Sequence, residues 1–175
     1  MKKIILIFTL LTTLGLNAQN ESNYFALEEG KVSWQKVYET KKSKEELISH
    51  FKSCGLFKLF RVEDGKIIAT LRPQPIDRTQ TGVASIPEIV LKTDYSGSVI
   101  IGLKEGKYRI TFKDILLVGK GDMIKKGEKQ KFEKHYVVKD GTAYRPFFSK
   151  KPSPIYNQHF SELFQLEAEK PKDDW

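Results

Sequence analysis

The chain contains little that could crosslink it or bind a metal. Cys54 is the only cysteine among 175 residues, so an internal disulfide bridge is excluded. Histidine occurs three times, at His50, His135 and His159, and no two of these have the spacing of a metal-binding motif. We therefore expect a fold held by packing alone, with no cofactor, and a Cys54 that serves as a small buried helix residue.

Motifs of catalysis are also missing. Tyr95-Ser96-Gly97-Ser98 lacks the Gly-x-Ser-x-Gly pattern of a nucleophile elbow, and Gly119-Lys120-Gly121-Asp122 lacks the Lys-Ser/Thr ending of a phosphate-binding loop. Both stretches are typical of turns, so we assign no catalytic residue and expect a protein that is not an enzyme. A small hydrolase or metal enzyme is the alternative, if the fold brings together at least two of His50, His135, His159, Asp77 and Asp114.

Only one long apolar run is present, and it lies at the start of the chain. Lys2 and Lys3 precede thirteen largely apolar residues, Ile4 to Leu16, and Ala18 follows shortly after. This order is typical of a secretory signal peptide, and the run is shorter than the about 20 residues of a spanning helix. We expect cleavage near Ala18 and an exported protein, periplasmic or extracellular. An uncleaved N-terminal anchor is the alternative.

The composition favours one globular domain. Hydrophobic residues make up 39% of the chain and aromatic residues 11%, which is sufficient for a core. The 30 basic and 22 acidic residues give a moderately basic balance that permits contact with anionic surfaces. After a signal peptide at 1–18, about 157 residues remain, the size of one ordinary domain. We expect a lead-in segment at 19–29, a single domain at 30–166 and a charged tail at 167–175.

The first part of this domain reads as a strand followed by a helix. Alternating large residues predict a strand over Lys31–Thr40. Ser43-Lys44-Glu45-Glu46 forms a capping box, and Leu47, Ile48, Phe51 and Cys54 recur at helical spacing. Gly55 provides the left-handed residue that ends a helix.

Hairpins follow. Leu56–Val62 and Lys66–Leu71 are joined by Glu63-Asp64-Gly65, and Ser98–Leu103 and Lys107–Leu117 by Lys104-Glu105-Gly106. In the last strand Tyr108, Ile110 and Phe112 alternate with Lys107, Arg109, Thr111 and Lys113, which predicts one core face and one solvated face.

The remaining segments are less regular. Pro87–Lys92 and Lys131–Val138 are expected to be short strands, and Arg72–Ile86 and Val118–Gln130 to be loops, the second a flexible one. A last helix begins at Pro154, with Ser153 as its cap. Together the pattern predicts an α+β, two-layer domain, whose largely antiparallel sheet has one face covered by two helices.

Three segments carry a family resemblance. GKVSWQKVYET, SKEELISHF and GKYRITFKDI resemble a family of exported bacterial domains of unknown function with a TATA-binding-protein-like (TBP-like) fold. The resemblance covers about Gly30 to Val118 and leaves 119–166 as an extension. It implies the fold and brings no catalytic or binding residues with it. The fold name does not imply DNA binding, because folds and functions are separable.

Two stretches are candidate contact surfaces. The first is lysine-rich and could meet anionic lipid or polysaccharide, although acidic residues interrupt it and a plain solvated loop is the alternative. Its lysines are Lys120, Lys125, Lys126, Lys129, Lys131 and Lys134. The second, Gly141–Tyr156, includes Tyr144 and Arg145 among further aromatic and basic residues, and suits a peptide, sugar or acidic group. Its alternative is an aromatic cluster folded back over the sheet.

From these observations we expect a non-enzymatic binding or interaction module of the envelope or periplasm. It would bind a protein, a polysaccharide or anionic lipid through its sheet or its long loops. Nucleic acid is not expected as a partner, because the aromatic residues follow core periodicity. A structural or assembly module that associates through an uncovered sheet face is a further alternative.

Overall fold

The computed structural model describes residues 24–76 and 85–166. The expected signal peptide, the charged tail and Asp77 lie outside these ranges. Within them, no helix is both long enough and apolar enough to cross a membrane.

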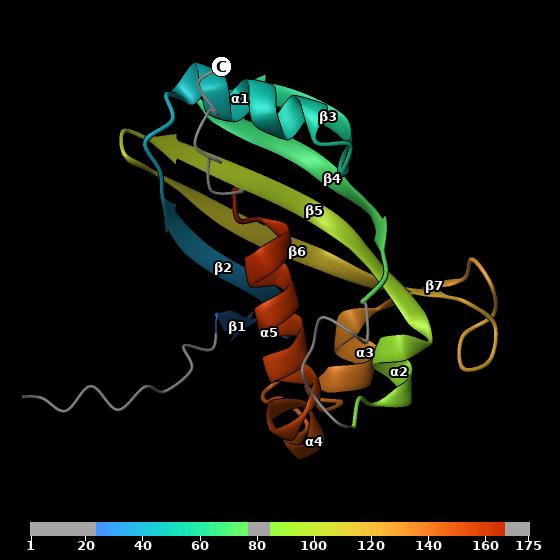
Figure 1. The fold of residues 1–175 in the computed structure, drawn as a ribbon. Coiled ribbons are helices and arrows are strands. Elements are labelled where there is room, and N and C mark those ends of the chain that lie inside the picture. Colours follow the sequence, from blue (N-terminus) through green and yellow to red (C-terminus); the bar gives the residue numbers. More distant parts are fainter. Residues whose placement is uncertain (1–23, 77–84, 167–175) are drawn as a thin grey trace, which may run out of the picture.

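The fold is built on one antiparallel sheet of seven strands (Figure 1). The strands are β1 (Phe25–Glu28), β2 (Lys31–Glu39), β3 (Phe57–Glu63), β4 (Lys66–Gln74), β5 (Thr93–Lys104), β6 (Lys107–Gly119) and β7 (Lys129–Lys131). Their order across the sheet is β1-β2-β6-β5-β4-β3, and β7 pairs with the end of β6 that extends beyond β2. The long hairpin β5–β6 therefore forms the centre of the sheet.

Five helices accompany the sheet. They are α1 (Lys44–Ser53), α2 (Glu88–Leu91), α3 (Phe132–Tyr136), α4 (Pro146–Lys150) and α5 (Pro152–Leu163). The two longest, α1 and α5, lie on the same face (Figure 1). Phe51 of α1 contacts Tyr108, and Phe160 of α5 contacts Phe112, which is four residues further along β6 and points to the same side. The predicted α+β class, with two helices over one face, is confirmed.

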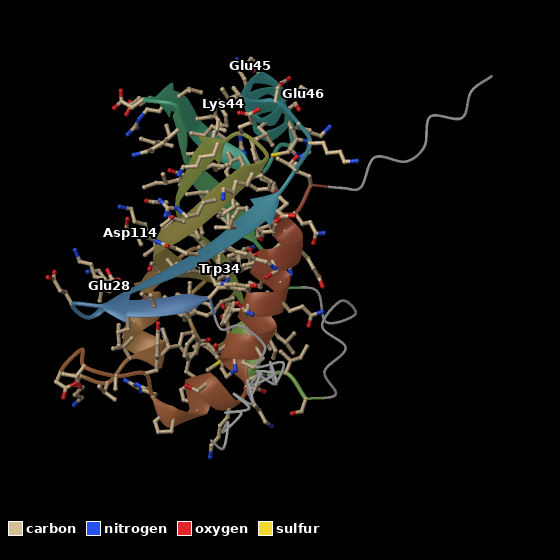
Figure 2. All side chains as sticks on the ribbon, turned by 90° about the vertical axis from the view of Figure 1, so that its left-hand side faces the viewer. Glu28, Trp34, Lys44, Glu45, Glu46 and Asp114 are labelled. Atoms are coloured by element: carbon tan, nitrogen blue, oxygen red, sulfur yellow. The ribbon has the colours of Figure 1, made fainter. Side chains whose placement is uncertain are left out.

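Aromatic side chains fill the space between sheet and helices. Trp34 of β2 is fully buried and meets Phe160 edge-on, with ring centroids 5.7 Å apart. Its indole Nε1 donates a hydrogen bond of 2.9 Å to Oδ1 of Asn157 on α5. This contact places Trp34 between β2 and α5 (Figure 2). The core therefore fixes both the distance and the register of α5 over the sheet.

Two predicted strands are helices. Residues 88–91 form α2, in which the consecutive residues Ile89 and Val90 are both buried, as a helix allows and an alternating strand does not. Within Lys131–Val138 only the first residue is in a strand; Phe132 and Tyr136 are four residues apart on α3 and pack against each other at 4.4 Å. Because both segments are short and rich in β-formers, propensity alone favoured the wrong structure.

Other boundaries differ as well. Residues 25–28 of the expected lead-in form β1, which pairs with β2 through a turn at Glu29 and Gly30, both with positive φ as a type I′ turn requires. The expected turn at Tyr95–Ser98 lies inside β5, at a bulge. The last helix starts at Pro152, two residues early, and no side chain caps it. The capping box of α1 and the left-handed Gly55 are as predicted.

Candidate functional site

One face of the sheet has none of the described helices against it. We call it the open face, and it consists of the side chains of β2 to β6 that alternate with the core residues. Ser33, Gln35, Val37 and Glu39 of β2 lie opposite Lys113, Thr111, Arg109 and Lys107 of β6 in register. Ser98, Ile100, Gly102 and Lys104 of β5 continue these rows, followed by residues of β4 and β3. The rows predicted to be solvated on β6 therefore belong to a surface that spans five strands.

The open face is basic. In the four rows that run across the strands through Lys113, Thr111, Arg109 and Lys107, the basic residues are Lys58, Arg61, Lys66, Lys104, Lys107, Arg109 and Lys113, and the acidic residues are Glu39 and Glu63. Arg61 forms an ion pair of 2.7 Å with Glu63 on the same strand. Within the described ranges, the side chains of the other six basic residues take part in no ion pair or hydrogen bond. Six cationic groups are therefore available to a partner.

The middle of the open face is apolar. Ile68 and Ile100 lie directly opposite each other, partly buried, with Thr111 beside them. Val37 is 54% exposed on the neighbouring strand. Among the described residues, no aromatic side chain belongs to this face. It therefore lacks the rings on which the bases of a single-stranded nucleic acid stack.

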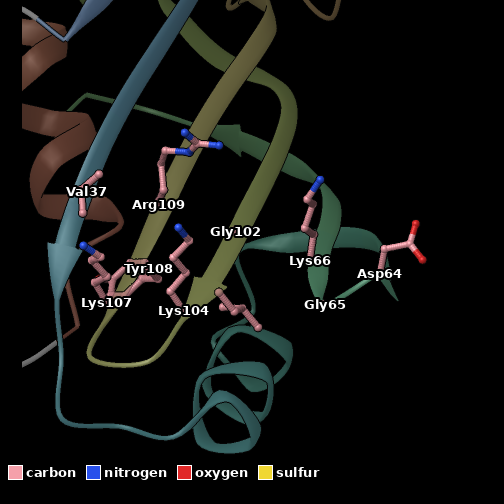
Figure 3. A pocket seen from close by; sticks show the side chains of 10 residues that line it. Val37, Asp64, Gly65, Lys66, Gly102, Lys104, Lys107, Tyr108 and Arg109 are labelled. Carbon is pink, nitrogen blue, oxygen red and sulfur yellow. The ribbon is translucent and has the colours of Figure 1, made fainter.

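A pocket of about 370 Å³ lies at the hairpin end of the open face. It is lined by Val37, Asp64, Gly65, Lys66, Gly102, Leu103, Lys104, Lys107, Tyr108 and Arg109. Figure 3 shows Lys66 on one side of Gly102 and Lys104 and Arg109 on the other, with the charged end of Lys107 farther away, beside Val37. The carboxylate of Asp64 points away from that position (Figure 3). We call this the Gly102 pocket.

The register of the strands explains the pocket. Gly102 lies directly between Lys66 of β4 and Arg109 of β6, in a single row. Since adjacent strands are roughly 4.8 Å apart, the backbones at Lys66 and Arg109 are roughly 10 Å apart with no side chain between them. Lys104 and Lys107 form the next row and close the end of the hollow. Four cations from three strands thus line the hollow, whose floor is bare backbone at Gly102.

Gly102 is not required by its backbone conformation. Its φ is not among the positive values of this chain, and an added Cβ would have only the Arg109 carbonyl oxygen within range, at 4.0 Å. A side chain could be accommodated, and a strand usually gains from one. The absence of a side chain at Gly102 therefore creates the hollow on the surface, and the fold does not depend on it.

The lysine-rich segment predicted from sequence spans a loop, a short strand and a helix. Lys120 is paired with Asp94 at 2.7 Å, and Lys92 is paired with Asp122. Lys125 and Lys126 are exposed in the loop, Lys129 and Lys131 lie on β7, and Lys134 is on α3. Hydrogen bonds from Gly119 N to the Glu128 carbonyl and from Gly127 N to the Gly119 carbonyl, both 2.9 Å, close this loop, which was expected to be flexible.

The apolar residues of that segment belong to the core. Ile124 is 2% exposed and Phe132 is fully buried, so neither can insert into a lipid surface. Lys131, Lys134 and Arg145 do come together, along a second pocket of about 550 Å³ beside Gly30 and Gly141. Of the eight predicted contact residues, these three share a site, and Lys125 and Lys126 do not line it.

Arg145 and Tyr144 have structural contacts. The guanidinium of Arg145 donates from Nε to the Val137 carbonyl at 3.0 Å and from Nη2 to the Lys134 carbonyl at 3.2 Å, holding the chain after α3. Tyr144 packs on the buried ring of Phe148 at 4.9 Å, and burial raises the pKa of Tyr144 to about 12. Tyr144 and Phe148 therefore fold back onto the core, whereas Phe147 remains 45% exposed.

The residues of the alternative enzyme hypothesis have separate neighbours. His50 on α1 contacts Phe51, and His159 on α5 contacts Tyr95 edge-on at 5.4 Å. His135 on α3 is hydrogen-bonded through Nε2 to Gln130 at 2.8 Å, and burial lowers its pKa. Asp114 lies at the bulge of β6 (Figure 2). Over residues 24–76 and 85–166, no three His, Cys, Asp or Glu side chains are arranged to hold a metal ion.

Comparisons with known proteins complete this description. A search of protein families and a search of curated proteins both give no match. Among solved structures, the chain is similar to a TBP-like protein from Parabacteroides distasonis, with 18% identity, a TM-score of 0.45, and coverage of 79% of this chain and 90% of that one. It is also similar to a DUF4468 family protein from Bacteroides ovatus, with 16% identity, a TM-score of 0.46, and coverage of 87% and 99%. Neither name states a ligand or an activity.

Proposed function

We propose that this chain is an exported, non-enzymatic binding module whose open face binds an anionic membrane surface. The observation that carries the proposal is the group of unpaired cations around the apolar centre of the open face. Such a face can approach the headgroups of a bilayer without rearrangement of its backbone.

The chemistry of the face favours lipid over the other envelope partners. Sugars and nucleic-acid bases are generally bound by stacking on aromatic rings, and the described part of the open face has none. Basic residues near an anionic bilayer each contribute about 1 kcal/mol to binding. The six unpaired cations, with one contribution subtracted for the negative charge of Glu39, thus provide roughly 5 kcal/mol of binding free energy at low salt. This is sufficient for reversible association with a membrane.

A binding experiment with vesicles tests the proposal. The protein without residues 1–18 is sedimented with phosphatidylglycerol-containing vesicles, and with neutral phosphatidylcholine vesicles for comparison. The double variant Lys58→Gln/Lys113→Gln removes two cations of the open face that do not line the Gly102 pocket. At about 1 kcal/mol per residue, its affinity for anionic vesicles should fall about tenfold or more, and binding should weaken with salt.

The matched control is Lys125→Gln/Lys126→Gln. It removes the same charge from the exposed loop, where sequence analysis placed a candidate surface. We expect this variant to bind almost as tightly as the unaltered protein. If the loop variant loses binding and the open-face variant keeps it, or if the unaltered protein does not distinguish anionic from neutral vesicles, the proposal is wrong.

A further inference from the structure

We propose that the Gly102 pocket binds a phosphate monoester group at the end of a lipid headgroup. This inference rests on the proposed function, because it names the chemical group that the open face selects from an anionic membrane.

The positive charge of the pocket favours an anion that carries more than one negative charge. Lys66, Lys104, Lys107 and Arg109 line it, whereas the carboxylate of Asp64, also a lining residue, points away from its centre. Lys104 and Lys107 are directly opposite each other in the β5–β6 pair, an unfavourable arrangement of like charges in which Glu39 of β2 adjoins Lys107 and not Lys104. A phosphate monoester carries about −1.5 to −2 charges at neutral pH, whereas a phosphodiester or a carboxylate carries about one. The pocket should therefore prefer the monoester.

The donors of the pocket suit phosphate geometrically. Arg109 offers a planar guanidinium that can bind two phosphate oxygens at once, and the three lysines offer ammonium groups that adjust to the remaining ones. All four groups come from regular strands, so their backbones are held in register by the sheet. A site built on strands is positioned more precisely than one built on loops.

The size of the pocket admits more than a phosphate. Its volume of about 370 Å³ lies within the range of small-molecule sites. Val37, which is 54% exposed, forms an apolar wall beside Arg109. The glycerol part of a headgroup can lie against this wall while the phosphate reaches the cations. The pocket is on the same face of the sheet as Ile68 and Ile100. These two apolar residues would lie against the boundary between the headgroups and the acyl chains of a bound membrane.

Gly102 is the residue on which the hollow depends. Any side chain there would point into the space between Lys66 and Arg109, because all three share one row of the open face. The surrounding structure has room for a Cβ, which would lie 4.0 Å from the Arg109 carbonyl oxygen, so a substitution should fill the pocket without disturbing the sheet. The variant Gly102→Val therefore separates the pocket from the fold.

The test compares two vesicle types of equal lipid charge. One contains phosphatidic acid, a monoester, and the other contains enough phosphatidylglycerol, a diester, to match its surface potential. The unaltered protein should bind phosphatidic acid vesicles about tenfold more tightly, because the extra charge of the monoester meets several cations at short range. Gly102→Val should abolish this preference and retain binding to phosphatidylglycerol. Ser98→Val, on the same strand and the same face but outside the pocket, should retain the preference.

Two further variants and a soluble competitor test whether the preference depends on the pocket. Arg109→Lys retains the charge and should reduce the preference, because an ammonium cannot form the two-point contact. Gly102→Ala replaces Gly102→Val if the valine variant does not fold, as judged by circular dichroism. Glycerol 3-phosphate serves as the soluble probe, and in excess it should compete with phosphatidic acid vesicles for the unaltered protein and not for Gly102→Val.

The outcomes separate the inference from the function on which it rests. If the unaltered protein binds both vesicle types equally and Gly102→Val changes nothing, the monoester site is overturned while the anionic face stands. If glycerol 3-phosphate binds at the pocket and no vesicle is bound, the pocket chemistry is supported and the membrane surface is overturned. Loss of all binding to both probes overturns both.

Discussion

Lys104 and Lys107 are directly opposite each other on the open face, as the last residue pair before the β5–β6 turn. Two like charges in this position destabilise a sheet by up to about 1 kcal/mol. We therefore predict that Lys104→Gln stabilises the unliganded protein by about 0.2–1 kcal/mol at low salt, with a smaller gain at high salt. Urea unfolding at two salt concentrations measures the effect.

The control for this prediction is Lys113→Gln. Lys113 lies on the same face, but its direct neighbours are Ser33 and Ser98, so no repulsion is relieved there. An equal gain in both variants would show that the effect is one of net charge and not of the facing pair.

Two glycines of β5 should respond in opposite ways to the same substitution. A Cβ at Gly97 would lie 2.8 Å from the Lys113 carbonyl oxygen and 2.9 Å from the ring of Phe112, both too close. We predict that Gly97→Ala destabilises by about 1–3 kcal/mol, as overpacking of a core does. Gly102→Ala should be neutral or stabilise by up to about 1 kcal/mol, because the unfolded chain loses freedom and no contact is strained.

Thermal and urea unfolding of the two alanine variants measure this difference. It also bears on the Gly102 pocket, since a stable Gly102→Ala shows that the glycine is not needed for folding. A destabilisation of Gly102→Ala equal to that of Gly97→Ala would contradict the prediction.

Much of the sheet could be predicted because its signals are local. The alternation around Tyr108 and Arg109 has a period of two, and the turn at Asp64-Gly65 carries its own sequence signature, with both residues at positive φ. The capping box at Ser43 is equally local, and it starts α1 as expected. The two short helices α2 and α3 were missed, because in so few residues burial and not periodicity decides the structure.

The Gly102 pocket could be predicted only in part. The sequence placed Lys107, Arg109 and Lys113 on a solvated face, and that is where they lie. Lys66 joins them only because β4 pairs with β5 in a register that sets it opposite Gly102. No local pattern contains this pairing. The lysine-rich loop has a higher density of charge along the chain than the strands that form the pocket. The ion pair of Lys120 with Asp94 and the burial of Ile124 show that part of this loop has a structural role.

The contact between Trp34 and Asn157 should be important for stability. Asn157 Oδ1 accepts from Trp34 Nε1 at 2.9 Å and from the backbone amide of Tyr24 at 3.3 Å. We predict that Asn157→Leu destabilises by about 1–3 kcal/mol, because it leaves the indole N–H of a buried tryptophan without an acceptor. Gln158→Leu, on the exposed side of the same helix, should change the stability by less than about 0.5 kcal/mol.

Urea unfolding followed by tryptophan fluorescence measures this contrast. An Asn157→Leu variant as stable as the unaltered protein would show that packing of Trp34 against Phe160, and not the hydrogen bond, holds α5 in place.

Alkaline pH should unfold the protein through its buried tyrosines. Burial raises the pKa of Tyr108 to about 12 from a model-compound value of 10.0, and burial also raises the pKa of Tyr95, Tyr136 and Tyr156. Above pH 10 the unfolded chain ionises these groups and the folded chain does not, so the unfolded state binds fewer protons. The stability is therefore complete below about pH 10 and falls as the pH rises towards 12.

Tyr108→Phe should reduce this pH dependence and should lower the stability of the protein near neutral pH. The hydroxyl of Tyr108 donates to the Phe164 carbonyl at 2.8 Å and accepts from the Leu166 amide at 3.3 Å, so its removal should cost about 1 kcal/mol. Between pH 10 and pH 12 the variant should lose less stability than the unaltered protein, because one group with a raised pKa is gone. Phenolate absorbance recorded with circular dichroism during an alkaline titration checks both points. Complete tyrosine ionisation while the circular dichroism stays native would show that burial does not control these groups, and the prediction would then be wrong.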